Sequence, residues 1–412
     1  MKNVPKLRFN GFSDEWEVKK LDEVTTYVDY RGKTPPKTEK GIFLVTAKNI
    51  KMGYIDYNVS QEFIAKESYK ESMRRGLPKI GDVLLTTEAP LGNVAQVDRD
   101  DIALAQRVIK FRGIEGELNN AYLKQYFISG IFQNALMNKA IGTTVLGIQG
   151  KVLHKMLIKF PSMEEQEKIA SFLTKVDRLI EKQDEKISNL EQYKKGMMQK
   201  IFSQEIRFKK ADGGEYPEWR NDILGKLGET YSGLSGKTKE NFGFGKGKYI
   251  TYMNVFKNIR SDINMVDLVD IGENEQQNNV LKGDILFTTS SETPEEVGMA
   301  SVCTIDEKSL YLNSFCFGFR LNDTNKVSSD FLAYFLRSPK IRLKISILAQ
   351  GSTRYNLSKT ELMKMNITMP CFEEQIKIAN FLSNIDSIVE KEKEKLEELR
   401  TWKKGLLQGM FI

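Results

Sequence analysis

Histidine and cysteine are scarce in this chain of 412 residues, which narrows the chemistry that it can carry. The one histidine, His154, provides neither a histidine cluster for a metal nor a second partner for a proton relay. The cysteines Cys303, Cys316 and Cys371 are odd in number and lack metal-ligand spacing, a usage typical of a reducing cytoplasm. We therefore expect no metal site and no catalytic site built on these residues.

Long apolar runs are also missing. No stretch of about 18 apolar residues is present, so no membrane-spanning helix is expected. The opening residues, MKNVPKLRFNGFSDEWE, lack the apolar core of a signal peptide. The composition, 40% hydrophobic and 10% aromatic, is typical of a folded globular chain. We expect a cytoplasmic protein of two to three domains that has no membrane partner.

Glycine-rich segments resemble nucleotide-binding loops only in part. GLSGKT (233–238) ends like a phosphate loop, but Tyr231 stands where the first glycine is required. The glycines of NFGFGKGKY (241–249) neither follow a clear strand nor open a clear helix, as a dinucleotide site requires. TPPK (34–37) lacks the Asp/Asn-Pro-Pro-Tyr/Phe pattern with which methyltransferases hold an amino group. These departures indicate a chain that binds and positions without a cofactor, with nucleotide hydrolysis at GLSGKT as an alternative.

An internal repeat is the strongest feature that the sequence does contain. Residues 158–202 and 367–411 align without a gap at a shift of 209, with 21 identities in 45 positions. This period is too long for a solenoid and indicates tandem duplication of a domain-sized unit. Duplication favours pseudo-twofold symmetry, which suits a two-sided partner such as double-stranded DNA.

Shorter matches extend the repeat into the rest of each half. They are Leu7–Phe9 with Ile206–Phe208, Glu15-Trp16 with Glu218-Trp219, Gly32–Thr34 with Gly236–Thr238, GDVLLTT (81–87) with GDILFTT (283–289), and Phe111-Arg112 with Phe319-Arg320. Between these matches the halves share little sequence, whereas the shift stays at 209 from about Tyr122 onward. The pattern predicts one scaffold that presents two different reading surfaces.

Each half is predicted to fold as an α/β (α+β) recognition domain of about 150 residues. GDVLLTT and GDILFTT read as a turn followed by a buried strand, and residues 40–50 and 246–256 as a second strand. Residues 120–140 and 329–348 have helical spacing of large apolar residues, and Pro339 should kink or split the second. A glycine-led loop follows each helical segment.

The repeated segments themselves predict two long helices. Apolar residues recur at alternating steps of four and three, which is the coiled-coil pattern. The expected seam consists of Ile169, Leu173, Val176, Ile180, Ile187 and Leu190, with Ile378, Leu382, Ile385, Val389, Leu396 and Leu399 in the second copy. Gln183 and Lys194 interrupt the first stripe where Glu392 and Lys403 interrupt the second. Ser162 and Glu165 predict a capping box at the start of the first helix.

These helices are expected to form an antiparallel coiled coil. The matched polar interruptions favour pairing, because polar seam residues select register. A helix of about 40 residues is roughly 60 Å long, which is more than one small domain needs. The predicted division is recognition domains at 1–157 and 205–366 and spacer helices at 158–204 and 367–412. Packing of each helix on its own globular half is the alternative.

The net charge of +7 is unevenly distributed along the chain. Residues 163–202 contain 8 acidic and 8 basic residues, and residues 372–411 contain 8 acidic and 7 basic residues. The rest of the chain therefore carries an excess of +8. A basic globular region beside neutral helices is what contact with DNA phosphates requires.

The segments EEQEKIASFLTKVD…KKGMMQKIF and EEQIKIANFLSNID…KKGLLQGMF resemble the two conserved regions of type I restriction-modification specificity subunits. The resemblance extends over nearly the whole chain, through the LRF…EW segments, GKTPP (32–36), the GD strands and the G[ST]T loops. It implies two target recognition domains that each read one part of a bipartite target in double-stranded DNA. The paired helices would set the gap between the parts and dock two methyltransferase subunits.

The resemblance also places the chemistry outside this chain. Methyltransferase partners would carry S-adenosylmethionine and methylate adenine. Two restriction subunits, where present, would add ATP- and Mg-dependent translocation and cleavage. A coiled-coil scaffold that binds only proteins and reads no DNA is the remaining alternative.

Candidate DNA contacts are basic and polar residues of the two globular halves. Lysine favours phosphate contact, whereas arginine and asparagine can read base edges. The predicted contacts are Arg31, Lys33, Lys37, Lys48, Arg107 and Thr144 in the first half and Lys237, Lys239, Lys246, Lys248, Asn254 and Arg354 in the second.

Overall fold

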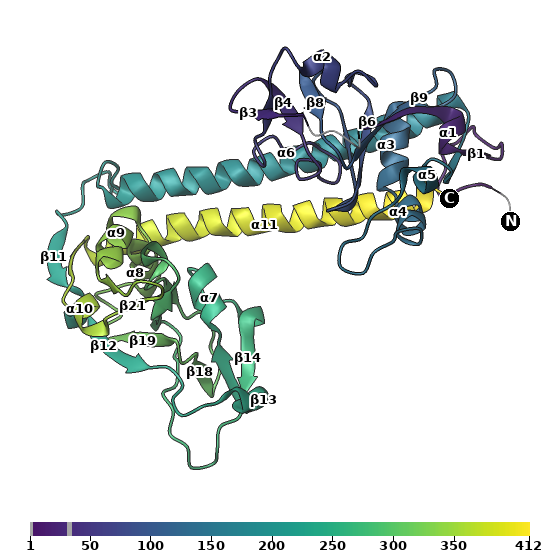
Figure 1. Ribbon diagram of the computed structural model, residues 1–412. Coiled ribbons are helices and arrows are strands. Elements are labelled where there is room, and N and C mark those ends of the chain that lie inside the picture. Colours follow the sequence, from purple (N-terminus) through teal and green to yellow (C-terminus); the bar gives the residue numbers. More distant parts are fainter. Residues whose placement is uncertain (1–2, 31–34) are drawn as a thin grey trace. The chain divides into compact units, whose positions relative to one another are not determined.

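The computed structural model describes residues 3–30 and 35–412 (Figure 1). The chain divides into two compact units, of which the first comprises residues 1–185 and 393–412 and the second residues 186–392. Each unit therefore combines one globular half with part of both long helices. The division predicted from the sequence separates the long helices from the globular regions, whereas these units divide each helix between them. The predicted boundaries therefore stay a prediction.

The main sheet of the first unit is antiparallel and has four strands. Their order is β2 (Thr25–Asp29), β9 (Val108–Gly113), β6 (Val83–Thr87) and β7 (Leu91–Gln96). All five residues of β6 are buried, as predicted for the strand of GDVLLTT. Two helices, α3 (Asn120–Ile128) and α4 (Gly130–Met137), contribute Tyr122, Phe127 and Phe132 to the core on this sheet.

Smaller elements complete the first unit. A second sheet has the order β3 (Lys37–Thr38), β5 (Phe63–Ile64), β4 (Ile42–Val45) and β8 (Ile102–Leu104), in which β4 and β8 are parallel. The remaining elements are the antiparallel pair β1 (Glu17–Lys20) and β10 (Leu157–Phe160), with the short helices α1 (Leu21–Val24), α2 (Tyr69–Ser72) and α5 (Gly150–Leu153).

The second unit repeats this plan. Its main sheet has the order β12 (Gly228–Ser232), β19 (Cys316–Leu321), β15 (Ile285–Thr288) and β17 (Ala300–Val302). A second sheet has the order β14 (Val266–Val269), β13 (Phe242–Ile250) and β18 (Leu310–Leu312), again with one parallel pair. The remaining strands are the pair β11 (Arg220–Ile223) and β22 (Asn366–Met369) and the set β16 (Ser290–Ser291), β21 (Tyr355–Leu357) and β20 (Ala349–Gln350).

The helices of the second unit are α7 (Tyr252–Lys257), α8 (Ser329–Leu336), α9 (Pro339–Ile347) and α10 (Lys359–Met363). Short 3-10 turns lie at Leu224–Lys226, Lys239–Asn241, Ile263–Met265 and Pro294–Glu296. The prediction of a strand through residue 256 was wrong at its end, because Thr251 caps a helix there by accepting a hydrogen bond from the Asn254 amide.

The expected break at Pro339 is present, but proline is not its general cause. The first unit breaks between α3 and α4 at the equivalent position, where glycine rather than proline opens the second helix. Both breaks follow a buried serine whose hydroxyl donates to a carbonyl three residues earlier, Ser129 to Tyr126 and Ser338 to Phe335, at 2.6 Å in each case. Pro339 occupies the first helical position, where its missing N–H costs nothing.

Two long helices, α6 (Met163–Phe202) and α11 (Phe372–Met410), take part in both units. They run antiparallel in each unit, because the residue numbers of the paired side chains rise along α6 as they fall along α11. Lys186 pairs with Glu392 and Lys194 with Asp386 in the second unit, and Asp177 with Lys403 and Asp184 with Arg400 in the first. Within the described residues, none of the helices combines the length and the apolar character needed to cross a bilayer.

The residues of the expected seam face away from solvent. Ile180, Leu190 and Leu399 are half-buried and the other nine are buried. The polar interruptions Lys194 and Lys403 bind the carboxylates of Asp386 and Asp177 on the opposite helix. Each carboxylate also accepts a hydrogen bond from the adjacent globular fold, Asp386 from Tyr334 and Asp177 from Gln125. The seam charges therefore tie the helix pair to each recognition fold.

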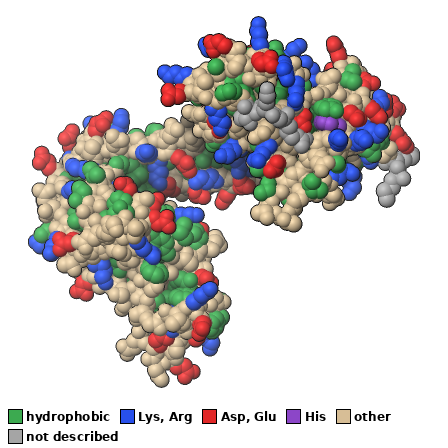
Figure 2. Space-filling model, in the orientation of Figure 1, with side chains coloured by type: hydrophobic (Ala, Val, Ile, Leu, Met, Phe, Trp, Pro, Cys, Tyr) green, Lys and Arg blue, Asp and Glu red, His purple; other side chains and the backbone are tan. Residues whose placement is uncertain are grey.

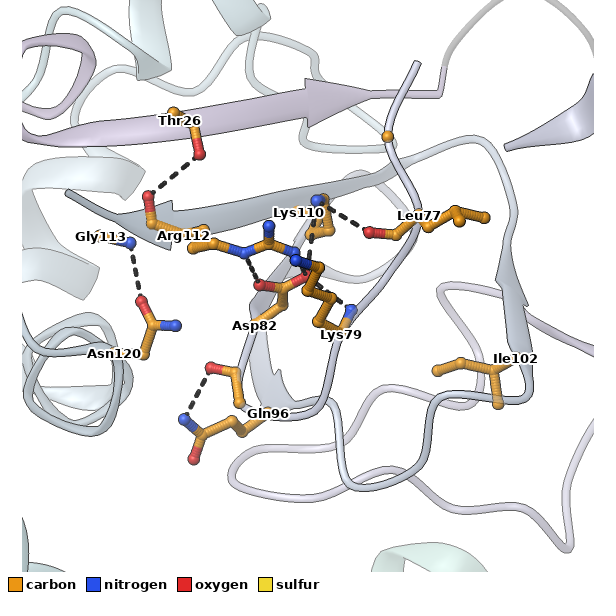
Figure 3. A network of polar contacts seen from close by, with 12 residues as sticks. Thr26, Leu77, Lys79, Asp82, Gln96, Ile102, Lys110, Arg112, Gly113 and Asn120 are labelled. Atoms are coloured by element: carbon orange, nitrogen blue, oxygen red, sulfur yellow. Dashed lines mark hydrogen bonds and ion pairs between the residues drawn. The ribbon is translucent and has the colours of Figure 1, made fainter. Parts of the chain in front are cut away.

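The repeated GD and Phe-Arg motifs bind each other. In the first unit the buried Asp82 accepts two hydrogen bonds from Arg112, at 2.6 and 2.7 Å, and lies 3.4 Å from Lys110 (Figure 3). In the second unit Asp284 accepts two from Arg320, at 2.9 and 2.8 Å. Burial lowers the pKa of Lys110, and the nearby Asp82 opposes that shift. These motifs repeat because they fix the main sheet.

The EEQ motif of each long helix has a similar structural role. Arg8 donates two hydrogen bonds of 2.8 Å to Glu165, and Arg207 donates two to Glu374. The glutamine that follows, Gln166 in α6, accepts from the Asn119 amide at 2.9 Å. Both carboxylate oxygens of Glu165 are thus held by an arginine 157 residues away, rather than in the predicted local capping box.

Candidate nucleic-acid interface

Three of the predicted contacts in the first unit gather around one groove. Lys37, Lys48 and Arg107 line a hollow of about 210 Å³ between the small sheet and the entry to β9. Lys37 forms an ion pair with Glu62 at 2.8 Å, whereas Lys48 is exposed. Figure 2 shows lysine and arginine side chains on the surface of this unit. Because Lys48 is exposed at this groove, it can contact a phosphate of an approaching backbone.

Arg107 is held in an unusual conformation at the edge of the groove. Its φ angle is 70°, a left-handed value that non-glycine residues adopt rarely. The Thr87 amide donates to its carbonyl at 2.9 Å, and its Nε lies 3.6 Å from the Glu88 carboxylate. Its side chain is nevertheless 48% exposed. The backbone is therefore fixed while the guanidinium remains accessible to a ligand.

The loop that contains Thr144 lies beside this position. Ile141 and Gly147 form a bridge, and Gly147 also bridges to Glu88, the ion-pair partner of Arg107. Gly142 has a φ of 114°, and a Cβ there would lie 2.2 Å from the Val145 carbonyl oxygen. The turn therefore requires glycine. Thr144 is exposed at its tip.

The second unit has the corresponding hairpin, formed by β20 and β21 and paired with β16. Arg354 lies on the hairpin loop, and its guanidinium carbon is 5.3 Å from the ring centroid of Phe315. Phe315 is 53% exposed, although Thr289 fixes its carbonyl through amide and hydroxyl hydrogen bonds of 2.9 and 2.7 Å. Nearby, Tyr252 donates to the Ser290 carbonyl at 2.6 Å, and burial raises the pKa of this tyrosine.

The predicted lysines of the second unit differ in how accessible they are. Lys239 and Lys246 are exposed, on the 3-10 turn before β13 and within β13. Lys248, further along β13, forms an ion pair with Glu307 at 2.7 Å. Lys239 and Lys246 therefore stay available for phosphate contact, whereas Lys248 is already partnered.

Two predicted contacts are occupied within the fold. Asn254 is fully buried, and its side-chain amide donates to the carbonyls of Asp262 and Met265. The side chain of Lys237 is 6% exposed. Its ammonium pairs with Glu275 and donates to the Asp270 carbonyl, and the hydrogen bond from Lys237 lowers the pKa of Glu275 to about 2. Both residues were predicted as DNA contacts because they are polar, but their side-chain nitrogens already donate to acceptors within the protein. The same pairing counts against a phosphate-binding lysine in GLSGKT.

Arg31 and Lys33 lie outside the described residues. Sequence reasoning missed Glu88 and Phe315, which flank the predicted arginines. The missed signal was the match of Phe111 with Phe319, because extending that match backwards places Arg107 opposite Phe315. Among the residues that the structure describes, no group of three or more histidine, cysteine, aspartate or glutamate side chains is arranged to hold a metal ion.

Comparison with known proteins identifies the fold. Residues 13–192 and 197–401 match the family described as the type I restriction modification DNA specificity domain. The chain therefore belongs to this family, of which it contains two successive domains. The resemblance predicted from the sequence is confirmed.

Curated relatives cover nearly the whole chain. It is 26% identical to the type I restriction enzyme MjaVIII specificity subunit of Methanocaldococcus jannaschii, over 94% of this chain and 90% of that protein. It is 23% identical to the type I restriction enzyme EcoKI specificity subunit of Escherichia coli strain K12, over 88% and 80% of the two. The predicted role as a specificity subunit, rather than a catalytic one, is confirmed by the family and by these names.

A solved structure supports the fold class. The crystal structure of the type I restriction-modification system S subunit from M. genitalium matches 99% of this chain and 99% of that chain, with a TM-score of 0.58 and 17% identity. This likeness confirms the predicted tandem α/β folds with long helices. The comparisons favour neither a scaffold without DNA reading nor a nucleotide-hydrolysing enzyme, and the family match indicates no cofactor for this chain.

Proposed function

We propose that this chain reads a bipartite target in double-stranded DNA, with one part of the target read by each unit. One observation carries this proposal. Both units build the same frame, in which a main-sheet strand and a glycine-led hairpin meet, but the exposed side chains on that frame differ. A shared frame with different side chains is what reading two different half-sites requires. The exposed Lys48, Lys239 and Lys246 would hold phosphates beside it.

The chain would dock two methyltransferase subunits, one on each unit. Leu179 and Ile388 occupy equivalent positions of the long helices and are 51% and 46% exposed; Tyr193 and Trp402 are also equivalent and are 52% and 46% exposed. Each unit thus exposes two large apolar side chains at repeated sites. The repetition of these exposed apolar side chains at equivalent positions suits two copies of one partner. Native mass spectrometry should find two partners on the native chain and one on the Leu179→Glu variant.

All chemistry would reside in the partners. The methyltransferase subunits would bind S-adenosylmethionine and methylate adenine, and restriction subunits, where two of them join, would use ATP and Mg. We place this assembly in the cytoplasm, in keeping with the three free cysteines of the chain.

The helices α6 and α11 would set the spacing between the half-sites. A matched test inserts seven residues after Ser188 and seven after Lys391, which are at the same level of the antiparallel pair. A whole heptad keeps the seam in register and adds about 10 Å. Since a duplex rises about 34 Å per 10 base pairs, the unread gap should grow by about three base pairs.

The readout is single-molecule methylation sequencing of DNA treated with the complete complex. The native complex should methylate a bipartite sequence, and the double insertion should keep both half-sites and lengthen the gap. Insertion into α6 alone is the control, because it misaligns the seam and should lower methylation at every site. A native complex without sequence preference would overturn the proposed function, and an unchanged gap would overturn the role of the helices.

A further inference from the structure

One backbone position, just before the second strand of the main sheet, is equivalent in the two units. Arg107 immediately precedes β9 and Phe315 immediately precedes β19. The carbonyl of each accepts a hydrogen bond of 2.9 Å from the amide of a threonine. In the first unit this is Thr87, the last residue of β6, and in the second it is Thr289, the residue after β15. The side chains of Arg107 and Phe315 therefore start from equivalent backbone positions in the two units.

A second position lies on the hairpin opposite. Val145 and Arg354 are equivalent at the shift of 209 that governs this part of the chain. Each ends a tight turn in which its carbonyl oxygen would lie 2.2 or 2.1 Å from a Cβ on the glycine three residues earlier. Both side chains are exposed. The hairpin is attached to the sheet through Glu88 in the first unit and Ser290 in the second.

The two units use these positions in opposite ways. The first unit has arginine before the strand and an apolar residue on the hairpin, and the second has an aromatic residue before the strand and arginine on the hairpin. In the second unit the two side chains lie together, with the guanidinium carbon of Arg354 over the ring of Phe315 at 5.3 Å from its centroid. Stacking on an aromatic face leaves the in-plane N–H donors of a guanidinium free and limits its rotamers.

We propose, building on the proposed function, that these two positions form the base-reading pair of each unit, and that Arg354, held by Phe315, reads a guanine in the half-site of the second unit. Arg107 performs the corresponding role in the first unit, with Glu88 as its positioning residue. A guanidinium donates two parallel hydrogen bonds to guanine O6 and N7, the commonest specific contact in the major groove.

The surroundings favour a base over a phosphate as the ligand of these arginines. A carboxylate 3.6 Å from Arg107 Nε repels phosphate, and yet it holds the guanidinium in place. Phe315 offers no positive charge to a DNA phosphate. An aromatic ring beside an arginine can instead pack against the flat face of a base. Phosphate contacts fall instead to lysines outside the pair, such as Lys239.

The test uses the complete complex with its methyltransferase partner and measures binding to a library of double-stranded sites. Arg354→Ala should reduce the preference for one guanine of one half-site by about 10- to 100-fold and leave the other half-site unchanged. Arg354→Lys should not restore the preference, because an ammonium cannot form the paired hydrogen bonds. Phe315→Leu should reduce the same preference by about 2- to 5-fold. The exchange Phe315→Arg with Arg354→Val should alter that half-site only.

Lys239→Ala is the matched control, because loss of an exposed phosphate contact weakens binding to all sequences alike. A uniform loss with Arg354→Ala would make that residue a phosphate contact and overturn the inference. Unchanged preferences of the Arg354→Ala complex at both half-sites, while the native complex reads a bipartite target, would also overturn the inference and leave the proposed function standing. Arg354 is exposed, so these variants should fold, and hydrogen exchange in β19 provides the check.

Discussion

The two units share a buried carboxylate and its arginine partner, but the third group around the carboxylate differs. Asp82 in the first unit faces both Arg112 and Lys110, whose side chain is almost fully buried. Asp284 in the second faces Arg320, which is 43% exposed, and accepts a hydrogen bond of 2.6 Å from Tyr231. The carboxylate and arginine hold the sheet in both units, whereas the third partner changes from a cation to a neutral hydroxyl. The scaffold thus tolerates exchange of a neighbour as long as the aspartate–arginine pair remains.

The largest expected effect comes from breaking this pair in the first unit. Asp82→Asn leaves two cations without a counter-charge, one of them buried, and should cost about 3–5 kcal/mol of local stability. Asp284→Asn should cost only about 1–3 kcal/mol, because Arg320 reaches solvent and still donates to the Asn279 carbonyl at 2.9 Å. The measurement is amide hydrogen exchange in β6 and β9 against β15 and β19. Equal losses would mean that Lys110 does not distinguish the units.

The sequence predicted what the repeat and local periodicity determine. The buried strands after the GD turns, the burial of the apolar stripe on the long helices and the break near Pro339 follow from patterns within a few residues. The repeat also singled out the aspartates and arginines of the GD and Phe-Arg motifs. It did not show that these residues bind each other, because spacing within one motif carries no information about distance in the fold.

The candidate site was less predictable for the same reason. Lysine and asparagine are equally polar whether they reach solvent or hold internal carbonyls, so Lys237 and Asn254 looked as suitable as Lys239. Glu165 matched a local capping pattern, but Arg8 supplies a stronger charged partner from the start of the chain. Phe315 was overlooked because an aromatic residue beside a strand is more often in the core.

A smaller effect is expected where the seam lysines meet the recognition folds. Asp177 has two lysines nearby, Lys403 at 2.5 Å and Lys124 at 3.7 Å, whereas Asp386 has Lys194 and the hydroxyl of Tyr334. Burial and Asp386 raise the pKa of Tyr334, so this residue stays a neutral donor. Lys194→Met should therefore cost about 1–2 kcal/mol and Lys403→Met less than about 1 kcal/mol, since Lys124 remains to compensate.

Hydrogen exchange along the paired helices measures both variants. The double variant Lys403→Met with Lys124→Ala is the control, and its cost should exceed the sum of the single costs because the two lysines share one carboxylate. Strict additivity would show that Lys124 does not substitute for Lys403.

The smallest expected difference concerns the helix breaks. Ser129 caps α4 by accepting a hydrogen bond from the Phe132 amide, in addition to its own donation to Tyr126. Ser338 donates to Phe335, and Pro339 ends the preceding helix regardless of that serine. Ser129→Ala should consequently cost about 1–2 kcal/mol, and Ser338→Ala about 0.5–1 kcal/mol.

This difference tests whether proline substitutes for a capping serine at an equivalent site. Hydrogen exchange of the first-turn amides of α4 and α9 should show faster opening for Ser129→Ala than for Ser338→Ala. Adding Gly130→Pro to Ser129→Ala should recover part of the loss, because the ring presets the first helical φ and leaves no N–H to satisfy. If the added proline lowers protection further, proline cannot replace Ser129 at the start of α4, although Pro339 occupies the equivalent position of α9.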